Sequence, residues 1–387
     1  MSRAYIRRCG TRAASRRVAG WLLGALALAG LAACSPGGTA SHPAGQEEKV
    51  LFIYNWVDFI GKSTIADFEK ETGIRVVYDT FDADVTLEAK LMAGDSGYDI
   101  AATAQNFYSR QIKAGAYEKL NRTLLTNWHY LDPALLRSVE SSDPGNQYAV
   151  PYLTSLNGFI YDEDKIRERM PNAPRDSLRM LFDPAIVSKF ADCGVSFLDS
   201  AEDVIQLGLA YLGRDPNSTS AKDLKDAEEL VVRVRPYIRT FDSSEYMTGL
   251  GNQEMCLVMA WSSDYSTAKA RAKAAGRDIN LHFTVPKEGS NFVLTSFLIP
   301  AGAPHPRAAH EFLNFILRPR VIAQITNDIR YPNPNLAATP FVDPEVLNDP
   351  AMYPPPAIMK RVYTATEVSV DYERLRTRAW TRIKTNH

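Results

Sequence analysis

The feature that most constrains this chain is an alternation of short β-rich runs with helical segments. Val50–Tyr54, Ile74–Tyr78 and Tyr98–Ala102 are runs rich in apolar and β-branched residues, and each is followed by a helical pattern that ends at a glycine. Such short connections predict a βαβαβα unit with a mainly parallel sheet. Ligands of these sheets bind beyond the carboxyl ends of the strands, so Asn55–Phe59 and Ala104–Asn106 are candidate site segments.

A second α/β stretch follows over residues 153–275. It contains two strand-like runs, Gly194–Leu198 and Cys256–Trp261, and a long helical section between them at Ala221–Val234. A strand at Leu281–Val285 and a helix at Arg307–Leu317 come next, before a tail rich in proline and aromatic residues. This organisation favours two α/β lobes of similar size, and a cleft between lobes is a common ligand site.

The first residues of the chain have the pattern of a targeting segment. Six arginines precede the apolar run Trp21–Ala33, which is too short to span a bilayer and has the length of a signal-peptide core. The run leads into Leu-Ala-Ala-Cys-Ser, which is typical of the bacterial lipoprotein processing box. We therefore predict a lipoprotein signal peptide over residues 1–33 and lipidation of Cys34; a plain signal peptide cut after Ala33 is the alternative.

Residues 34–48 are rich in Ser, Pro and Gly, which predicts a flexible tether. An anchor, a tether and a globular body describe a protein of the bacterial periplasm that contacts a membrane through its lipid alone. Of the four cysteines, only Cys193 and Cys256 lie in the body. Two cysteines of an exported protein most often form a disulfide, and two buried free thiols are the alternative.

The charge of the body argues against one class of function. The formal net charge is −1, but without the six N-terminal arginines 38 basic and 45 acidic residues remain, a net charge of −7. Nonspecific nucleic-acid binding needs a basic surface, so no nucleic-acid partner is expected. An acidic body is compatible with a cationic ligand.

Motifs for catalysis and metal binding are weak. The sequence has no Gly-rich phosphate loop and no His-Glu-x-x-His. Its histidines lack metal-ligand spacing, except for His305 and His310, which flank a predicted helix start and are interpreted as solvated. Ser266–Lys269 matches Ser-x-x-Lys, but the usual companion motifs are absent. We therefore expect no enzyme activity, no metal and no cofactor.

The informative constellation combines tryptophan with aspartate just after strands. Trp56 and Asp58 follow the first strand, Trp261 and Asp264 follow a later one, and Tyr331 lies in the tail. Indole faces attract organic cations, and a neighbouring carboxylate adds a charge-assisted hydrogen bond. The two pairs suit an alkylammonium ligand, although by spacing alone such a pair is more often a core residue beside a surface residue.

Several stretches of the body carry a family resemblance. They are Ile53–Trp56, Phe68–Gly73, Lys90–Gly94, Cys193–Asp199, Val285–Gly289, Phe312–Phe315, Ala337–Pro340 and Arg376–Trp380. Through them, the chain from about Val50 to Thr385 resembles the periplasmic polyamine-binding proteins of bacterial ABC transporters, nearest the putrescine-binding branch. The resemblance implies a two-lobe α/β fold with mixed, mainly parallel sheets, hinge strands and an interlobe cleft. We place lobe 1 at 49–152 with 278–325 and lobe 2 at 153–277 with 326–387.

The resemblance also implies ligand contacts and a disulfide. Carried over position by position, the ligand contacts fall on Trp56, Asp58, Phe59, Asp203, Ser243, Trp261, Asp264, Thr295 and Tyr331. Cys193 and Cys256 match cysteines that are paired in close relatives.

Several site positions depart from the family pattern. Val57 and Ala104 replace serines, and Phe59 replaces a tyrosine. Val293 and Thr295 stand where the family has a wall aromatic and a second aspartate. A threonine hydroxyl accepts a hydrogen bond but cannot balance an ammonium group. We therefore expect weaker or altered recognition of one end of a diamine.

The leading hypothesis is a monomeric, lipid-anchored solute-binding protein that captures putrescine or a related polyamine for the permease of an ABC importer. One alternative is an amine-sensing lipoprotein that signals to a membrane receptor. Another is a binder of a less charged amine. A lipoprotein enzyme would need a nucleophile and base pair, and the sequence does not offer one.

Overall fold

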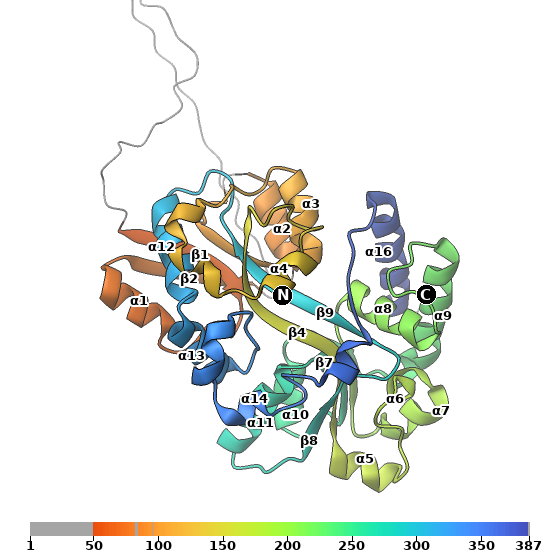
Figure 1. The fold of residues 1–387 in the computed structure, drawn as a ribbon. Coiled ribbons are helices and arrows are strands. Elements are labelled where there is room, and N and C mark those ends of the chain that lie inside the picture. The colour runs from red at the N-terminus through yellow and green to blue at the C-terminus, as the bar shows by residue number, and fades with distance from the viewer. Residues whose placement is uncertain (1–48, 82–83, 95, 386–387) are drawn as a thin grey trace, which may run out of the picture. The chain divides into compact units, whose positions relative to one another are not determined.

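A computed structural model describes residues 49–81, 84–94 and 96–385 (Figure 1). The strands are β1 (Val50–Trp56), β2 (Arg75–Phe81), β3 (Ile100–Ala104), β4 (Ala149–Asp162), β5 (Val195–Phe197), β6 (Thr240–Phe241), β7 (Leu257–Trp261), β8 (Leu281–Thr284), β9 (Ser290–Leu298) and β10 (Val362–Thr364). The predicted signal peptide, the tether and Cys34 lie outside the described residues. Within the described ranges, no helix has the length and apolar character needed to cross a membrane.

The described residues also form sixteen α-helices and five short 3₁₀ helices. The α-helices are α1 (Thr64–Thr72), α2 (Asp84–Met92), α3 (Gln105–Lys113), α4 (Pro133–Ser138), α5 (Glu163–Arg169), α6 (Arg179–Phe182), α7 (Pro184–Val187), α8 (Ala201–Tyr211), α9 (Ala221–Val234), α10 (Tyr246–Gly251), α11 (Asp264–Ala274), α12 (Pro306–Ile316), α13 (Pro319–Ile329), α14 (Pro344–Leu347), α15 (Pro356–Met359) and α16 (Val370–Thr385). The 3₁₀ helices are η1 (Arg122–Leu124), η2 (Thr126–Tyr130), η3 (Ser188–Phe190), η4 (Arg235–Tyr237) and η5 (Leu336–Phe341).

The first lobe is built on the parallel strands β2, β1 and β3, which confirms the predicted parallel unit with bounds shifted by a few residues. Helices cover both faces of this sheet. Ile53 packs in one core cluster with Phe68 of α1 and Phe312 of α12, while Tyr54 packs in another with Tyr98. Burial on both faces explains why β1 is continuously apolar instead of alternating with polar residues.

The second lobe contains the parallel strands β7, β5 and β6. Strands β5 and β7 lie within the predicted strand-like runs, and α9 begins and ends at the residues predicted for the long helical section. α16 packs on α8 and α9, whereas η5 packs on α13. The chain after residue 326 therefore contacts both lobes, and the lobe boundaries given above stay a prediction.

Two long strands that the sequence analysis does not identify connect the lobes. Ala149–Leu156 of β4 pairs antiparallel with β9, and Asn157–Asp162 of the same strand pairs antiparallel with β7 or β8. β9 also pairs with β3, so the strand order runs β2-β1-β3-β9-β4-β7-β5-β6. Figure 1 shows β4 and β9 crossing between the two groups of helices. The fold is therefore a two-lobe α/β fold with a mixed sheet, parallel inside each lobe and antiparallel at the crossing.

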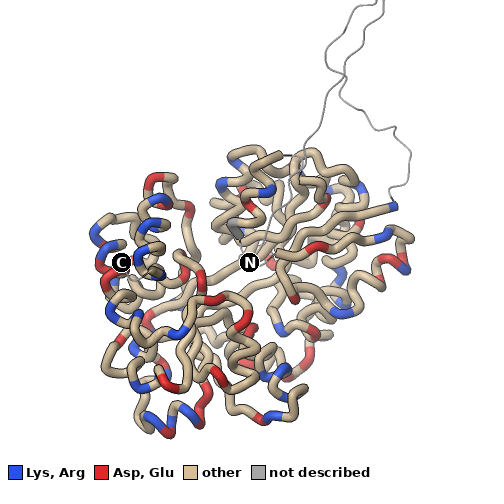
Figure 2. The backbone as a smooth tube through the Cα atoms, turned by 180° about the vertical axis from the view of Figure 1, so that it is seen from behind, with Lys and Arg blue, Asp and Glu red and all other residues tan. Residues whose placement is uncertain are grey.

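The crossing strands carry almost no charge. β9 has no charged residue, and β4 has only Asp162 at its end. Lys and Arg are interspersed with Asp and Glu along the helices and connecting segments (Figure 2). Any charge offered to a ligand near the crossing strands must therefore come from the turns and helix starts around them.

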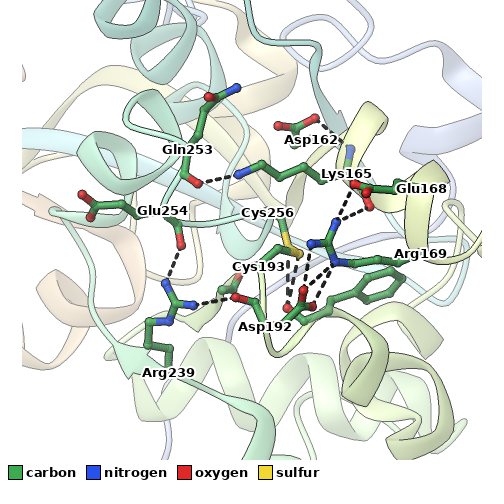
Figure 3. Close-up of a disulfide and its surroundings, with 12 residues drawn as sticks. Asp162, Lys165, Glu168, Arg169, Asp192, Cys193, Arg239, Gln253, Glu254 and Cys256 are labelled. Carbon is green, nitrogen blue, oxygen red and sulfur yellow. Dashed lines mark hydrogen bonds and ion pairs between the residues drawn. A yellow bond between two sulfur atoms is a disulfide. The ribbon is translucent and has the colours of Figure 1, made fainter.

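The predicted disulfide is present between Cys193 and Cys256, whose Cα atoms are 5.6 Å apart (Figure 3). It joins the segment before β5 to the start of β7. Gly194 follows Cys193 with a φ of 97°, and a Cβ at this position would meet the Glu254 carbonyl oxygen at 2.2 Å. Only glycine fits here, because a side chain would push the two cysteine-bearing segments apart.

We expect reduction of this disulfide to lower the thermal stability of the protein. The bond closes a loop with a sequence separation of 63 residues, and the chain-entropy model assigns such a loop ~4 kcal/mol of stabilisation. Thermal unfolding with and without a reductant measures the loss, and a thiol assay on unreduced, denatured protein should find neither Cys193 nor Cys256 free. Both thiols reacting in that assay would contradict the pairing in the exported protein.

Candidate functional site

The turn that follows β1 is organised by Asn55, a fully buried residue at the start of the candidate segment Asn55–Phe59. Its Nδ2 donates to the carbonyl oxygen of Phe59 and to the hydroxyl of Tyr78, both at 2.9 Å. Its Oδ1 accepts the backbone N–H of Trp56 at 2.8 Å. Within this turn Asp58 has a positive φ of 56°, a conformation that aspartate tolerates better than most residues. Asn55 thus fixes the segment that carries Trp56 and Asp58.

The aromatic residues around this turn form two sets of ring contacts. The ring of Trp56 packs against Phe81 with centroids 4.5 Å apart. Phe59 is buried and makes edge contacts with Tyr152 and Tyr331, at 5.7 and 4.7 Å between centroids. The first-strand turn is therefore linked through Phe59 to Tyr331, which follows α13.

Asp264 is the centre of the second predicted pair. Trp261 ends β7, the buried residues Ser262 and Ser263 form the turn, and Asp264 begins α11 with only 5% of its surface exposed. The Tyr331 hydroxyl donates to Oδ1 at 2.6 Å, and the hydroxyl of Tyr246 donates to Oδ2. Burial raises the pKa of Asp264 to about 6, although the two tyrosine hydroxyls act in the opposite direction because they favour the charged form.

Asp58 lies in a different electrostatic environment from Asp264. Its side chain is 64% exposed and forms an ion pair of 2.8 Å with the guanidinium of Arg271 on α11. Arg271 also donates to the hydroxyl of Thr248 on α10 at 2.9 Å. A full positive charge therefore compensates the Asp58 carboxylate, whereas the hydrogen-bond donors to Asp264 among the described residues are neutral hydroxyls.

The strand register places the positions that depart from the family pattern. On β9, Thr295 is opposite Ala104 of β3 on one side and Leu153 of β4 on the other. Val293 is opposite Ser155 of β4. Side chains of directly paired residues point to the same face of a sheet, so these positions lie together on one face of the crossing strands.

Asp203 reaches the same face through Asn157. Asn157 is opposite Trp261 in the register of β4 and β7, and its Nδ2 donates to the carboxylate of Asp203. Burial raises the pKa of Asp203, while hydrogen bonds from Ser200, Asn157 and Asn291 favour its charged form. The Asn157 Oδ1 atom is buried and has no hydrogen-bond partner among the described residues. Trp261, Asn157 and Asp203 therefore form a continuous row.

Glu202, next to Asp203, connects the two lobes. Its carboxylate accepts a hydrogen bond from Asn106 at the start of α3 and lies 3.5 Å from Arg376 of α16. Burial raises the pKa of Glu202, and the positive charge of Arg376 opposes this shift. Asn106 belongs to a segment that the sequence analysis selects by its position after the third strand, and here it contacts the second lobe.

Ser243 differs from the other predicted site residues in its contacts. Its hydroxyl accepts the backbone N–H of Asp199 at 3.1 Å, and it lies in the turn before α10. Among the residues that sequence reasoning missed, Tyr246 lies three positions later and Arg271 lies on α11. No local motif distinguishes either residue, because each gains its role from a contact far along the chain.

A cavity of about 520 Å³ lies beside the crossing strands. Thr154, Ser155 and Leu156 of β4 line it together with Phe292 of β9. None of the predicted ligand residues lines this cavity. In the described part of the chain, no group of three or more His, Cys, Asp or Glu residues could hold a metal ion.

Comparisons with known proteins relate this geometry to one class of protein. A family model described as bacterial extracellular solute-binding protein matches residues 63–354. The chain is 43% identical over 366 residues to the putrescine-binding periplasmic protein PotF of Escherichia coli, covering 94% of this chain and 97% of that protein. It is 41% identical over 355 residues to the putrescine-binding periplasmic protein SpuD of Pseudomonas aeruginosa, covering 92% of this chain and 97% of that protein.

A solved structure has a similar arrangement of the backbone. A protein described as a spermidine/putrescine ABC transporter from Listeria monocytogenes is 27% identical to this chain and superposes with a TM-score of 0.78. The match covers 88% of this chain and 100% of that chain. The similarity therefore extends over both lobes and over the crossing strands between them.

Proposed function

Because this chain belongs to the family of bacterial extracellular solute-binding proteins, we propose that it captures putrescine or a related polyamine in the periplasm for the permease of an ABC importer. The observation that carries the proposal is the environment of Asp264. Its buried carboxylate follows Trp261 after a two-residue turn and accepts hydrogen bonds from two uncharged hydroxyls. An ammonium group supplies the charge that this carboxylate needs, and the indole supplies a cation–π surface.

The row beyond Trp261 suits the rest of an amine ligand. Cross-strand neighbours have Cβ atoms about 4.5–5.5 Å apart, so Asn157 lies directly beside Trp261. The free acceptor Oδ1 of Asn157 can take an N–H of the ligand, and Asp203 stands behind it as a second buried acid. An alkyl chain that carries amino groups matches this order of carboxylate, aromatic face and amide.

Calorimetric titration of the mature protein tests the proposal. Putrescine, cadaverine, spermidine and agmatine are compared with 1,4-butanediol, which has the length of putrescine but no charge. We expect measurable heat and a single site for at least one amine, and no binding of the diol. Binding of the diol with similar affinity, or binding of none of the amines, would contradict amine capture.

Transport and anchoring extend the proposal beyond the ligand. We infer that β4 and β9 act as the hinge of the two lobes, that the protein is a monomer, and that it performs no chemistry on its ligand. Cleft closure would sequester the cation and present the closed form to the permease. Two curated relatives are named as putrescine-binding periplasmic proteins, which supports the compartment.

We expect Cys34→Ala to release the protein from membranes or to leave the precursor unprocessed. The reason is that the lipid attached to this cysteine would hold the mature protein at the membrane. Fractionation of cells followed by immunoblotting measures both outcomes, and Ser35→Ala serves as the control because it leaves the cysteine in place. Unchanged membrane fractionation and unchanged size of the Cys34→Ala protein would count against lipidation.

A further inference from the structure

Tyr246 lies in a position that only the tertiary structure reveals. It is the first residue of α10, its side chain is 1% exposed, and its hydroxyl donates to Oδ2 of Asp264. Its backbone N–H donates to Oδ1 of Asp242 at 3.0 Å, which fixes the start of the helix. A buried tyrosine whose hydroxyl is aimed at a ligand-site carboxylate has a specific orientation to maintain.

We propose that Tyr246 is a positioning residue for amine capture, whose hydroxyl holds the Asp264 carboxylate in the orientation in which it meets the ammonium group of the ligand. The inference rests on the proposed function, in which Asp264 is the ammonium partner. Tyr246 itself does not touch the ligand in this scheme. It acts through Asp264, from the side of α10, while Tyr331 acts from the side of α13.

The number of acceptor positions on the carboxylate supports this role. An ionised carboxylate offers about four lone-pair positions on its two oxygens. Tyr246 occupies one on Oδ2 and Tyr331 one on Oδ1, so each oxygen keeps one position for the ammonium group. Because hydroxyl donors are neutral, they orient the carboxylate without cancelling its charge, unlike Arg271 at Asp58.

Helix packing gives the orientation its rigidity. α10 packs directly on α11, and two side-chain hydrogen bonds between described residues join these helices. One joins Tyr246 to Asp264, and the other joins Thr248 to Arg271 at 2.9 Å. A movement of α10 would therefore disturb the carboxylate at the first turn of α11 and the arginine near its end together.

The charged and titratable groups around Asp264 determine its pKa. Tyr246 on α10 and Tyr331 after α13 donate to it, and Arg271 on α11 lowers its pKa through its positive charge while bonded to Asp58. β7 has no titratable residue, and His282 of β8 contacts Asn280 and Tyr161 instead. Removal of the Tyr246 hydroxyl should raise the pKa of Asp264 further, because that hydroxyl stabilises the charged form.

The protonation of Asp264 sets the direction in which pH changes the affinity for an amine. Alkylammonium groups stay protonated between pH 5 and 8.5, as a lysine side chain does, so only the protein titrates. Below the pKa of Asp264, which burial raises to about 6, the carboxyl is neutral and cannot balance the ammonium group. Amine affinity should therefore fall as the pH drops through this value, and it should fall at a higher pH without the Tyr246 hydroxyl.

Tyr246→Phe tests the inference by calorimetry with putrescine from pH 5 to 8.5. We expect about tenfold weaker binding at pH 8 and a pH midpoint of binding raised by about one unit. Tyr246→Met, which also lacks the hydroxyl, is the second variant should the first fail to fold. Tyr265→Phe is the matched control, because Tyr265 is the next residue of α11 and its hydroxyl bonds Asp349 instead.

The outcomes separate this inference from the proposed function. If the wild type binds putrescine and Tyr246→Phe keeps both its affinity and its pH midpoint, the positioning role is overturned while amine capture stands. The positioning role is also overturned if Tyr246→Phe loses as much thermal stability as Tyr265→Phe does while its pH midpoint of putrescine binding stays that of the wild type. If the wild type binds no amine, the proposed function itself has failed.

Discussion

Asp264→Asn should weaken putrescine binding at least tenfold. The change removes the negative charge that the ammonium group meets in a buried setting, where a hydrogen bond to a charged group contributes about 1.5–3 kcal/mol. That range corresponds to roughly ten- to a hundredfold in affinity. Calorimetry at pH 8 measures the effect, since Asp264 is then ionised in the wild type.

The same substitution should leave the ligand-free protein at least as stable as the wild type at neutral pH. Burial raises the pKa of Asp264 above its ordinary value of 3.8, so the folded state holds the proton more tightly than the unfolded state does. The stability that this group contributes is present below pH 3.8 and is lost as the pH rises through about 6. Asparagine carries no charge and removes this loss.

Asp349→Asn is the matched control for the loss of the Asp264 charge. Asp349 also has a pKa raised by burial and also accepts a tyrosine hydroxyl, that of Tyr265. It should therefore report the general effect of neutralising such a carboxylate, with no change in amine affinity. Equal putrescine affinity of the wild type and Asp264→Asn would refute the role of Asp264 as the ammonium partner.

Thr295→Asp should strengthen putrescine binding by about 1–3 kcal/mol. Thr295 is buried between Ala104 and Leu153, and its hydroxyl cannot balance a second ammonium group. Asp58 is the remaining acid for this second end of the diamine, and Arg271 already compensates its charge. A carboxylate at position 295 would restore the missing partner, provided that the diamine extends toward β9.

Thr295→Asn separates charge from size in this experiment. It has nearly the same volume as aspartate, so we expect it to leave putrescine affinity within about a factor of three of the wild type, because no charge is gained. Without ligand, Thr295→Asp should unfold at a lower temperature than Thr295→Asn, since it buries an unpaired charge, and putrescine should reverse this difference. Identical binding by both variants would show that Thr295 does not face the second amino group.

The sequence by itself determined the elements whose causes are local. Val50–Tyr54 is predicted as a strand because its apolar residues must be buried on both faces. The residues of α9 form a helix because their apolar positions are periodic and Ser220 precedes the first turn. Trp261 and Asp264 could be selected because a strand end and the following helix start fix both side chains within four residues. Counting the cysteines of the body favoured a disulfide between Cys193 and Cys256, which the structure contains.

The tertiary structure alone decided which groups meet across the chain. β4 escaped prediction because it is buried over nearly its whole length and interrupted by polar residues, so it lacks the alternation of an exposed strand. Asp264 is bonded by tyrosines 18 and 67 positions away, and Asp58 is paired with an arginine 213 positions away. No local pattern encodes such contacts. The ion pair of Asp58 and Arg271 forms because β4 and β9 bring the two lobes together, and Tyr246 meets Asp264 because α10 packs on α11. That placement decides which carboxylate remains charged for a ligand and which is neutralised.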